Sequence, residues 1–196
     1  MTTVGRPAVF LDRDGVINEN LPGAYVDRWE AFRFLPGAVE AIVQLSRAGW
    51  PVVVVTNQAG IGRGYMTEAA LEEIHTQMVA AIEARGGRVD AVLYCPHTPD
   101  SDCECRKPRP GLFRRAAAQL DLDLARSVIV GDHVTDVQAG LAAGCRPILV
   151  LTGRGPAAWT AAGGDPQLAS VAMADDLLAA VQLILSPERR LSAPRP

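Results

Sequence analysis

The sequence predicts a doubly wound α/β fold, in which helices cover both faces of a parallel sheet. Two patterns along the chain indicate this. Short β-rich segments are apolar at every position, which is typical of strands buried on both faces. Segments with apolar residues at helical spacing separate them, so strand and helix alternate as in right-handed βαβ units.

The first half of the chain is predicted to hold two strand-helix pairs. The strand Ala8–Leu11 precedes a helix that begins after Gly37. The strand Pro51–Thr56 precedes a helix with Thr67 as its N-cap. The apolar stripes of the two helices are Val39, Ile42, Val43 and Leu45, and Leu71, Ile74, Met78 and Ile82.

The second half continues the alternation. Helices are expected to begin at Pro110, which suits a first helical turn, and to span Thr135–Ala143 and Ala174–Leu185. Gly144 is expected to end the middle one of these helices. The remaining strands are expected at Ala91–Cys95, Ser127–Gly131 and Pro147–Leu151.

Size and composition favour a single soluble domain. The 196 residues suit one domain, expected at residues 1–187, with a polar, proline-rich tail at 188–196. The net charge of −3 gives no electrostatic reason to expect nucleic acid or a membrane surface as a partner. The N-terminus lacks a signal-peptide pattern, and no apolar run approaches the roughly 18 to 20 residues that span a bilayer. We therefore expect a cytoplasmic protein, and a monomer.

Polar residues follow four of the predicted strands. The carboxyl ends of parallel strands share one edge of the sheet, where doubly wound folds bind ligands. We therefore expect these residues to meet at one site: Asp12 and Asp14, Thr56 and Asn57, Cys95 and His97, and Asp132.

The two aspartates in "DRDG" allow two interpretations. An Asp-Gly turn explains them as well as chemistry does, if they are considered alone. In the alternative, one of the two is a nucleophile for phosphorus and the other is a neighbouring acid and base. Asp132 in "GDHVTD" adds a third carboxylate, and such a group of oxygen ligands suits Mg²⁺. The combination favours the chemical interpretation.

The loop "TNQAGIGRG" can bind a phosphate group. Thr56 offers a hydroxyl group, and the turn after it exposes backbone N–H groups. Each glycine alone is better explained by a flexible loop. Arg63 is different, because a guanidinium group between glycines can reach over a bound anion and hold it in a bidentate manner.

The segment "CPHTPDSDCEC" gathers soft metal ligands. Cys95, His97, Cys103 and Cys105 could form a disulfide clip, a metal site or a nucleic-acid finger. In a reducing compartment such spacing favours a metal, and three thiolates with one imidazole leave no open position on a tetrahedral Zn²⁺. A structural zinc site is therefore predicted. Cys145, alone among apolar residues, is expected to be a buried thiol.

Four motifs in order resemble those of the haloacid dehalogenase superfamily of phosphotransferases: "DRDG", "TNQ", "CRKPRPG" and "GDHVTD". The resemblance implies a Rossmann-like sheet in which Asp12 is the nucleophile and Asp14 the acid and base. It implies further that Thr56 and Lys107 hold the phosphoryl group, with Asn57 and Gln58 also assigned to substrate binding. Asp12, the backbone carbonyl of Asp14, and Asp132 would bind Mg²⁺.

Within this superfamily the chain is similar to two groups, the D-glycero-D-manno-heptose 1,7-bisphosphate 7-phosphatases and the histidinol-phosphate phosphatases. Both carry a zinc loop after the third strand, where relatives often have a cap domain, and this chain has no gap for a cap. Arg63 and the pair Arg106-Lys107 resemble substrate contacts of the heptose enzymes. A heptose bisphosphate is therefore the expected substrate, and histidinol phosphate is the alternative.

Two departures from the heptose enzymes concern the substrate side. The segment 18–34 is longer, which leaves contacts of residues 20–25 open. His133 stands where those enzymes usually have lysine, so we expect a partial positive charge near neutrality and substrate contact there. A zinc-stabilised nucleic-acid-binding module is the competing class of function, which the acidic net charge and the short ligand spacing oppose.

Overall fold

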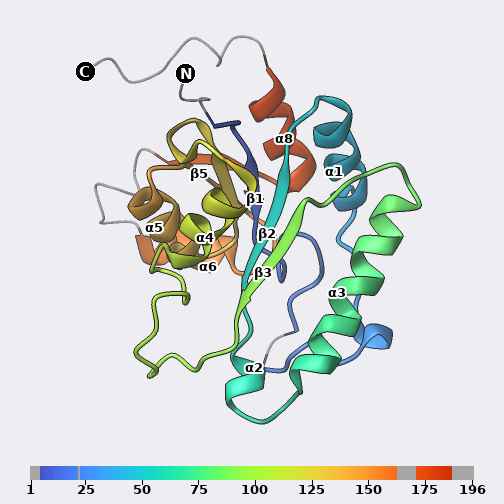
Figure 1. Cartoon of the computed structure of the whole chain (residues 1–196), viewed down its shortest axis with the longest axis vertical. Helices are drawn as coiled ribbons and strands as arrows, with labels where there is room; N and C mark the ends of the chain where they lie inside the picture. Colours follow the sequence, from blue (N-terminus) through green and yellow to red (C-terminus); the bar gives the residue numbers. More distant parts are fainter. Residues whose placement is uncertain (1–4, 22, 163–170, 187–196) are drawn as a thin grey trace.

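A six-stranded parallel sheet lies between two layers of helices in the computed structural model, which describes residues 5–21, 23–162 and 171–186 (Figure 1). The predicted doubly wound α/β fold is thus confirmed. No helix among the described residues is long and apolar enough to cross a membrane. The strands are β1 (Val9–Leu11), β2 (Val52–Asn57), β3 (Ala91–Cys95), β4 (Val128–Gly131), β5 (Arg146–Val150) and β6 (Ala172–Ala174).

The strand order is β3-β2-β1-β4-β5-β6, with all neighbours parallel. The chain runs outward from β1 through β2 to β3, and then returns to pair β4 with the other side of β1. This reversal creates a crevice at the carboxyl ends of β1 and β4, because the connections leave in opposite directions there. The fold therefore prepares a binding site beside Leu11 and Gly131.

Helices cover both faces of the sheet (Figure 1). Alternate residues of β1 point to opposite faces, so Val9 and Leu11 belong to one core cluster and Phe10 to the other. The helices on the first face are α1 (Ala38–Arg47), α3 (Glu68–Glu83) and α8 (Leu177–Leu185), and those on the second are α4 (Gly111–Leu120) and α5 (Val134–Ala143), with α6 (Gly155–Ala162) beside α5.

Most element ends lie close to the predicted residues, because the terminal signals act as expected. The Thr67 side chain accepts a hydrogen bond from the Ala70 N–H and caps α3. Gly144 ends α5 with a φ of 85°, a left-handed conformation that favours glycine. All four apolar residues predicted for the α3 stripe are buried: Leu71, Ile74, Met78 and Ile82.

Several elements differ from the prediction. Ala174 ends strand β6 and does not begin a helix, since Asp176 caps α8 and its side chain accepts the Ala179 N–H. The three-residue edge strand β6 is too short to give a periodic signal. Helix α6 was not predicted, and part of the glycine loop forms one helical turn, α2 (Ala59–Gly62). The expected tail at 188–196 lies outside the described residues.

Candidate active site

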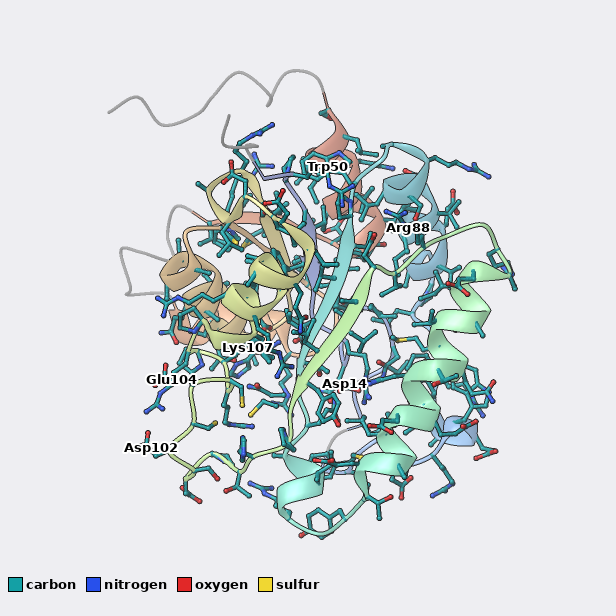
Figure 2. All side chains as sticks on the ribbon, in the orientation of Figure 1. Asp14, Trp50, Arg88, Asp102, Glu104 and Lys107 are labelled. Carbon is teal, nitrogen blue, oxygen red and sulfur yellow. The ribbon has the colours of Figure 1, made fainter. Side chains whose placement is uncertain are left out.

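A pocket of about 560 Å³ opens at the carboxyl ends of the strands. Asp12 follows β1, Thr56 lies at the end of β2, and Asp132 follows β4, so the crevice at the strand reversal forms the floor of the pocket. Figure 2 shows Lys107 and Asp14 at this end of the sheet. The lining also includes four arginines, Arg63, Arg106, Arg109 and Arg154. The pocket thus combines acidic groups at its floor with several cations.

Three buried carboxylates meet on the floor of the pocket. Asp12, Asp132 and Asp136 each bring an oxygen within 4.8 Å of the other two, and we call these three residues the carboxylate cluster. Asp136 belongs to the first turn of α5, where the backbone N–H of His133 donates to its Oδ2 at 3.0 Å. The sequence placed Asp136 at a helix start but gave it no site role, because aspartate is common there without function.

Lys107 supplies the positive charge of the cluster. Its Nζ lies 2.7 Å from Asp12 Oδ1 and 2.6 Å from Asp136 Oδ1, and it donates to the Val55 carbonyl at 2.8 Å. The residue is only 3% exposed. Burial alone would lower the pKa of Lys107, but the two aspartates outweigh burial and raise it. Lys107 therefore stays charged beside Asp12.

One cation is too little for three carboxylates. Burial, with the charges of neighbouring aspartates, raises the pKa of Asp12 to about 6 and that of Asp132 to about 8. Among the described residues, Asp12 Oδ2 and Asp132 Oδ1 accept no hydrogen bond. Unpaired carboxylate oxygens in a buried acidic group are what a hard divalent cation requires, so the residues fit Mg²⁺.

A loop after β5 holds Asp132 from behind. The Arg154 N–H donates to Asp132 Oδ2 at 2.8 Å, and the Thr152 hydroxyl donates to the Gly15 carbonyl at 2.6 Å. A Cβ atom at Gly15 or Gly153 would collide with the Asp132 carboxylate. Sequence reasoning missed this loop, although "TGRG" directly after a buried strand was the available signal.

Asp14 is held apart from the carboxylate cluster by hydrogen bonds. Its oxygens accept from Arg13 Nη2 at 2.8 and 3.0 Å, from Asn18 Nδ2 at 2.9 Å and from Gln58 Nε2 at 2.8 Å. Burial alone would raise the pKa of Asp14, but the Arg13 guanidinium and the other donors outweigh burial and lower it. Asp14 is therefore ionised in this arrangement.

The side chains after β2 mainly contact other site residues. The Asn57 side chain accepts from the Lys107 N–H and donates to the Lys107 carbonyl, both at 3.1 Å. Gln58 bridges Thr56 Oγ1, at 2.9 Å, and Asp14. Asn57 and Gln58 both line the pocket. Through these hydrogen bonds their side-chain amides hold other residues of the site in position.

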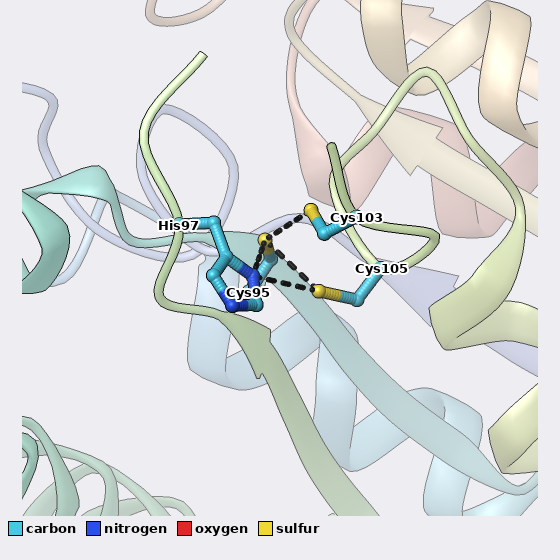
Figure 3. Close-up of side chains that lie close together, drawn as sticks. All are labelled: Cys95, His97, Cys103 and Cys105. Carbon is cyan, nitrogen blue, oxygen red and sulfur yellow. Dashed lines mark hydrogen bonds between the residues drawn. The ribbon is translucent and has the colours of Figure 1, made fainter. Parts of the chain in front are cut away.

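Four sulfur and nitrogen ligands gather where the loop 96–110 leaves β3 (Figure 3). All four ligand atoms of the cysteine cluster, which is Cys95, His97, Cys103 and Cys105, lie within 4.8 Å of one another. The Cys95 sulfur lies 3.8 Å from the Cys103 sulfur and 3.1 Å from the Cys105 sulfur. The cysteines form no disulfide. The residues fit a closed, tetrahedral zinc site.

The remaining predicted residues lie around the pocket. Arg63 donates to the Tyr25 hydroxyl at 3.1 Å, and Arg106 donates to the His97 carbonyl at 3.0 Å. Tyr25 and its neighbours line the pocket, which places part of the segment left open by the sequence at the site.

His133 also lines the pocket but differs from its prediction. Burial lowers its pKa, and its Nδ1 accepts the Thr135 N–H at the start of α5. An accepting nitrogen carries no proton, so His133 is neutral in this arrangement. Both observations favour a neutral ring over the expected partial charge, and substrate contact at His133 stays a prediction.

Comparisons with known proteins agree with this site. A family model described as haloacid dehalogenase-like hydrolase matches residues 13–140, and a second HAD-hydrolase-like model matches residues 104–180. A Pseudomonas putida protein named D-glycero-beta-D-manno-heptose-1,7-bisphosphate 7-phosphatase is 48% identical over 147 residues, which cover 75% of this chain and 83% of that protein. A protein of the same name from Bordetella bronchiseptica is 44% identical over 177 residues, covering 90% and 97%.

Solved structures extend the likeness to three dimensions. The crystal structure of D,D-heptose 1,7-bisphosphate phosphatase from B. bronchiseptica, complexed with magnesium and phosphate, superposes with a TM-score of 0.85 at 43% identity. The superposition covers 91% of this chain and 98% of that one. The corresponding Burkholderia thailandensis enzyme gives a TM-score of 0.70 at 41% identity, covering 92% and 99%.

Proposed function

Because the chain belongs to the haloacid dehalogenase-like hydrolases, we propose that it removes the 7-phosphate of D-glycero-β-D-manno-heptose 1,7-bisphosphate through an aspartyl-phosphate intermediate. One observation carries the proposal. Asp12 lies on the floor of a pocket lined by several cations, with one oxygen held by Lys107 at 2.7 Å and the other unpaired among the described residues. A nucleophile with a fixed orientation and a neighbouring cation is what attack on an anionic phosphate requires.

The reaction proceeds in two displacements. Asp12 Oδ2 attacks phosphorus, the bond to the sugar oxygen breaks, and Asp14 gives a proton to the leaving alcohol. Asp14 then removes a proton from water, whose oxygen attacks the phosphorus of the aspartyl phosphate and releases inorganic phosphate and free Asp12. Asp14 is ionised without substrate, and the negative charge of a bound phosphate beside it raises its affinity for the proton.

Metal ions complete the proposed site. Asp12, Asp132 and the backbone carbonyl of Asp14 would hold Mg²⁺, which neutralises charge on the phosphoryl oxygens during transfer. Lys107 keeps Asp12 in position through each displacement. The cysteine cluster would hold Zn²⁺ as a structural ion, because four protein ligands leave no position for substrate.

The pocket's arginines support a substrate with two phosphates. Arg63 and Arg106 line the same pocket as Asp12. They come from the segments that follow β2 and β3. When one phosphate group is bound at Asp12, these two guanidinium groups can bind the second phosphate group of the substrate. Arginine suits this role because it binds phosphate in a bidentate manner. Histidinol phosphate has no second phosphate, and the relatives described above carry the heptose name, so that alternative is not favoured.

Phosphate release tests the proposal. Both anomers of the heptose 1,7-bisphosphate and histidinol phosphate are compared by kcat/KM with magnesium present. We expect the highest value for the β-anomer, with one phosphate released per molecule. A higher value for histidinol phosphate would overturn the substrate assignment, while hydrolysis of none of the three would overturn the phosphatase proposal.

A further inference from the structure

Helix α3 carries a buried histidine that the site described above does not use. The buried residues of α3 are apolar except His75, which is 7% exposed. A polar side chain in such a position is costly unless it has a hydrogen-bond partner. The His75 partner is Arg13, whose Nη1 lies 3.2 Å from His75 Nε2, although 62 residues separate them in the chain.

Arg13 connects this histidine to Asp14. Arg13 has no exposed surface and lies between the two aspartates of the first motif. Its Nη2 and Nε donate to the Asp14 carboxylate, and its Nη1 faces His75. A guanidinium group is a rigid planar fork, so fixing one nitrogen also fixes the others. The position of the Asp14 carboxylate is thus coupled to a helix outside the pocket.

The direction of the hydrogen bond follows from the chemistry of the two groups. Arginine can only donate, so His75 Nε2 must accept, and the ring proton must lie on Nδ1. Burial, together with the Arg13 charge, lowers the pKa of His75 to about 3, so the ring is neutral and suited to accept. His75 therefore acts as an acceptor for an arginine that would otherwise have one buried edge without a described partner.

We propose that His75 is a positioning residue of the phosphatase reaction, which holds Arg13 and through it the acid and base Asp14. The inference rests on the proposed function, since it assigns His75 to the step in which Asp14 protonates the leaving alcohol. It predicts that loss of the acceptor harms leaving-group protonation more than it harms binding.

The test compares three variants with the unchanged protein. His75→Met replaces the imidazole acceptor with a thioether, a much weaker acceptor, on a side chain of similar length. His75→Gln restores an acceptor oxygen. Met78→Ala is the matched control, because it disturbs the same buried face of α3 one turn away and removes no described hydrogen bond of Arg13.

The measurement is kcat/KM on two phosphates that differ in their leaving groups. In the heptose bisphosphate the leaving group is a sugar alkoxide, which needs a proton, whereas in p-nitrophenyl phosphate it is a stable nitrophenolate, which needs none. For His75→Met we expect kcat/KM to fall by about tenfold on the heptose bisphosphate and by less than about twofold on p-nitrophenyl phosphate. His75→Gln should recover most of the loss, and Met78→Ala should leave the ratio of the two values unchanged.

Equal losses on both phosphates in His75→Met, or the same change of ratio in Met78→Ala, would overturn the inference. If the unchanged protein hydrolyses neither phosphate, the proposed function fails, and crystal structures of the His75 variants decide the inference separately. We expect Arg13 and the Asp14 carboxylate to move in His75→Met and to keep their places in His75→Gln. An unmoved Asp14 in His75→Met would refute the positioning role.

Discussion

The carboxylate cluster and the cysteine cluster gather ligands in opposite ways. The carboxylate cluster is buried and is assembled by the fold, from residues after β1 and β4 and in the first turn of α5. The cysteine cluster extends to the surface and comes from one continuous stretch of chain, Cys95 to Cys105. Within the described part of the chain, the first leaves one oxygen each of Asp12 and Asp132 without a hydrogen bond, while the second offers the four ligands of a tetrahedral Zn²⁺. A ligand set with free oxygens suits a catalytic metal ion, and a complete ligand set suits a structural one.

Lys107 connects the two clusters. It follows Cys105 by two residues in the chain, and its Nζ reaches Asp12 at 2.7 Å. The Asn57 side chain bonds both the N–H and the carbonyl of Lys107. The end of β2 therefore also fixes the position at which the loop 96–110 passes the site. We therefore expect the cysteine cluster to affect the reaction through the direction in which the chain leaves it.

The largest difference between the clusters should follow Asp12→Asn. The substitution removes the proposed nucleophile while keeping its shape, so kcat should fall by a factor of about 10⁴ or more. Because it also relieves repulsion within the carboxylate cluster, the melting temperature should not fall. Phosphate release and thermal unfolding measure the two effects, with the exposed Asp100→Asn as the control. Activity retained in Asp12→Asn would refute the assigned nucleophile.

Lys107→Met should damage both stability and activity. It leaves Asp12 and Asp136 without their buried cation, and breaking a buried ion pair typically costs about 3 to 5 kcal/mol. Urea unfolding of the metal-free protein measures the loss. Arg106→Met removes a neighbouring cation with no described ion pair and should cost less than about 1 kcal/mol. Equal costs for the two variants would contradict the central place given to Lys107.

Zinc removal should have a smaller effect than either substitution. Chelation opens the loop 96–104, and closing a loop shorter than about 15 residues is worth less than about 3 kcal/mol by chain entropy. Asn57 still holds Lys107, so kcat/KM should fall by only about tenfold when magnesium is resupplied. Cys103→Ser should lose zinc, while Cys145→Ala, outside the cluster, should retain it. If kinetics and melting temperature were unchanged after full chelation, the cysteine cluster would have no effect on the reaction at the carboxylate cluster.

The last expected effect concerns stability alone, as a dependence on pH in the metal-free protein. The pKa of Asp12 is raised to about 6 and that of Asp132 to about 8, so the folded chain binds these protons more tightly than the unfolded chain does. Stability should therefore be greatest in acid and be lost as the pH rises through these values. Magnesium should flatten the decline. Melting temperatures recorded from about pH 5 to pH 9 that rise in metal-free buffer would contradict the sign.

The fold and the motif residues could be predicted because their signals are local. Buried parallel strands are apolar throughout, and polar residues directly after them must share one sheet edge. Contacts between distant side chains gave no such signal. Asn57 faces the backbone of Lys107, Asp136 binds its ammonium group, and His75 meets Arg13, each across tens of residues. Which distant group a polar side chain contacts depends on how the elements pack, and the sequence pattern does not indicate it.

The loop that holds Asp132 bears on how much of the chain the active site needs. One of the two family models stops at residue 140, the other continues to residue 180, and the last sequence motif ends at Asp136. The Thr152 hydroxyl and the Arg154 N–H arrive later in the chain and reach Gly15 and Asp132. A fragment cut at residue 140 would keep the four sequence motifs and lose the loop that contacts Asp132, the proposed metal ligand. The minimal catalytic unit therefore extends at least through Arg154.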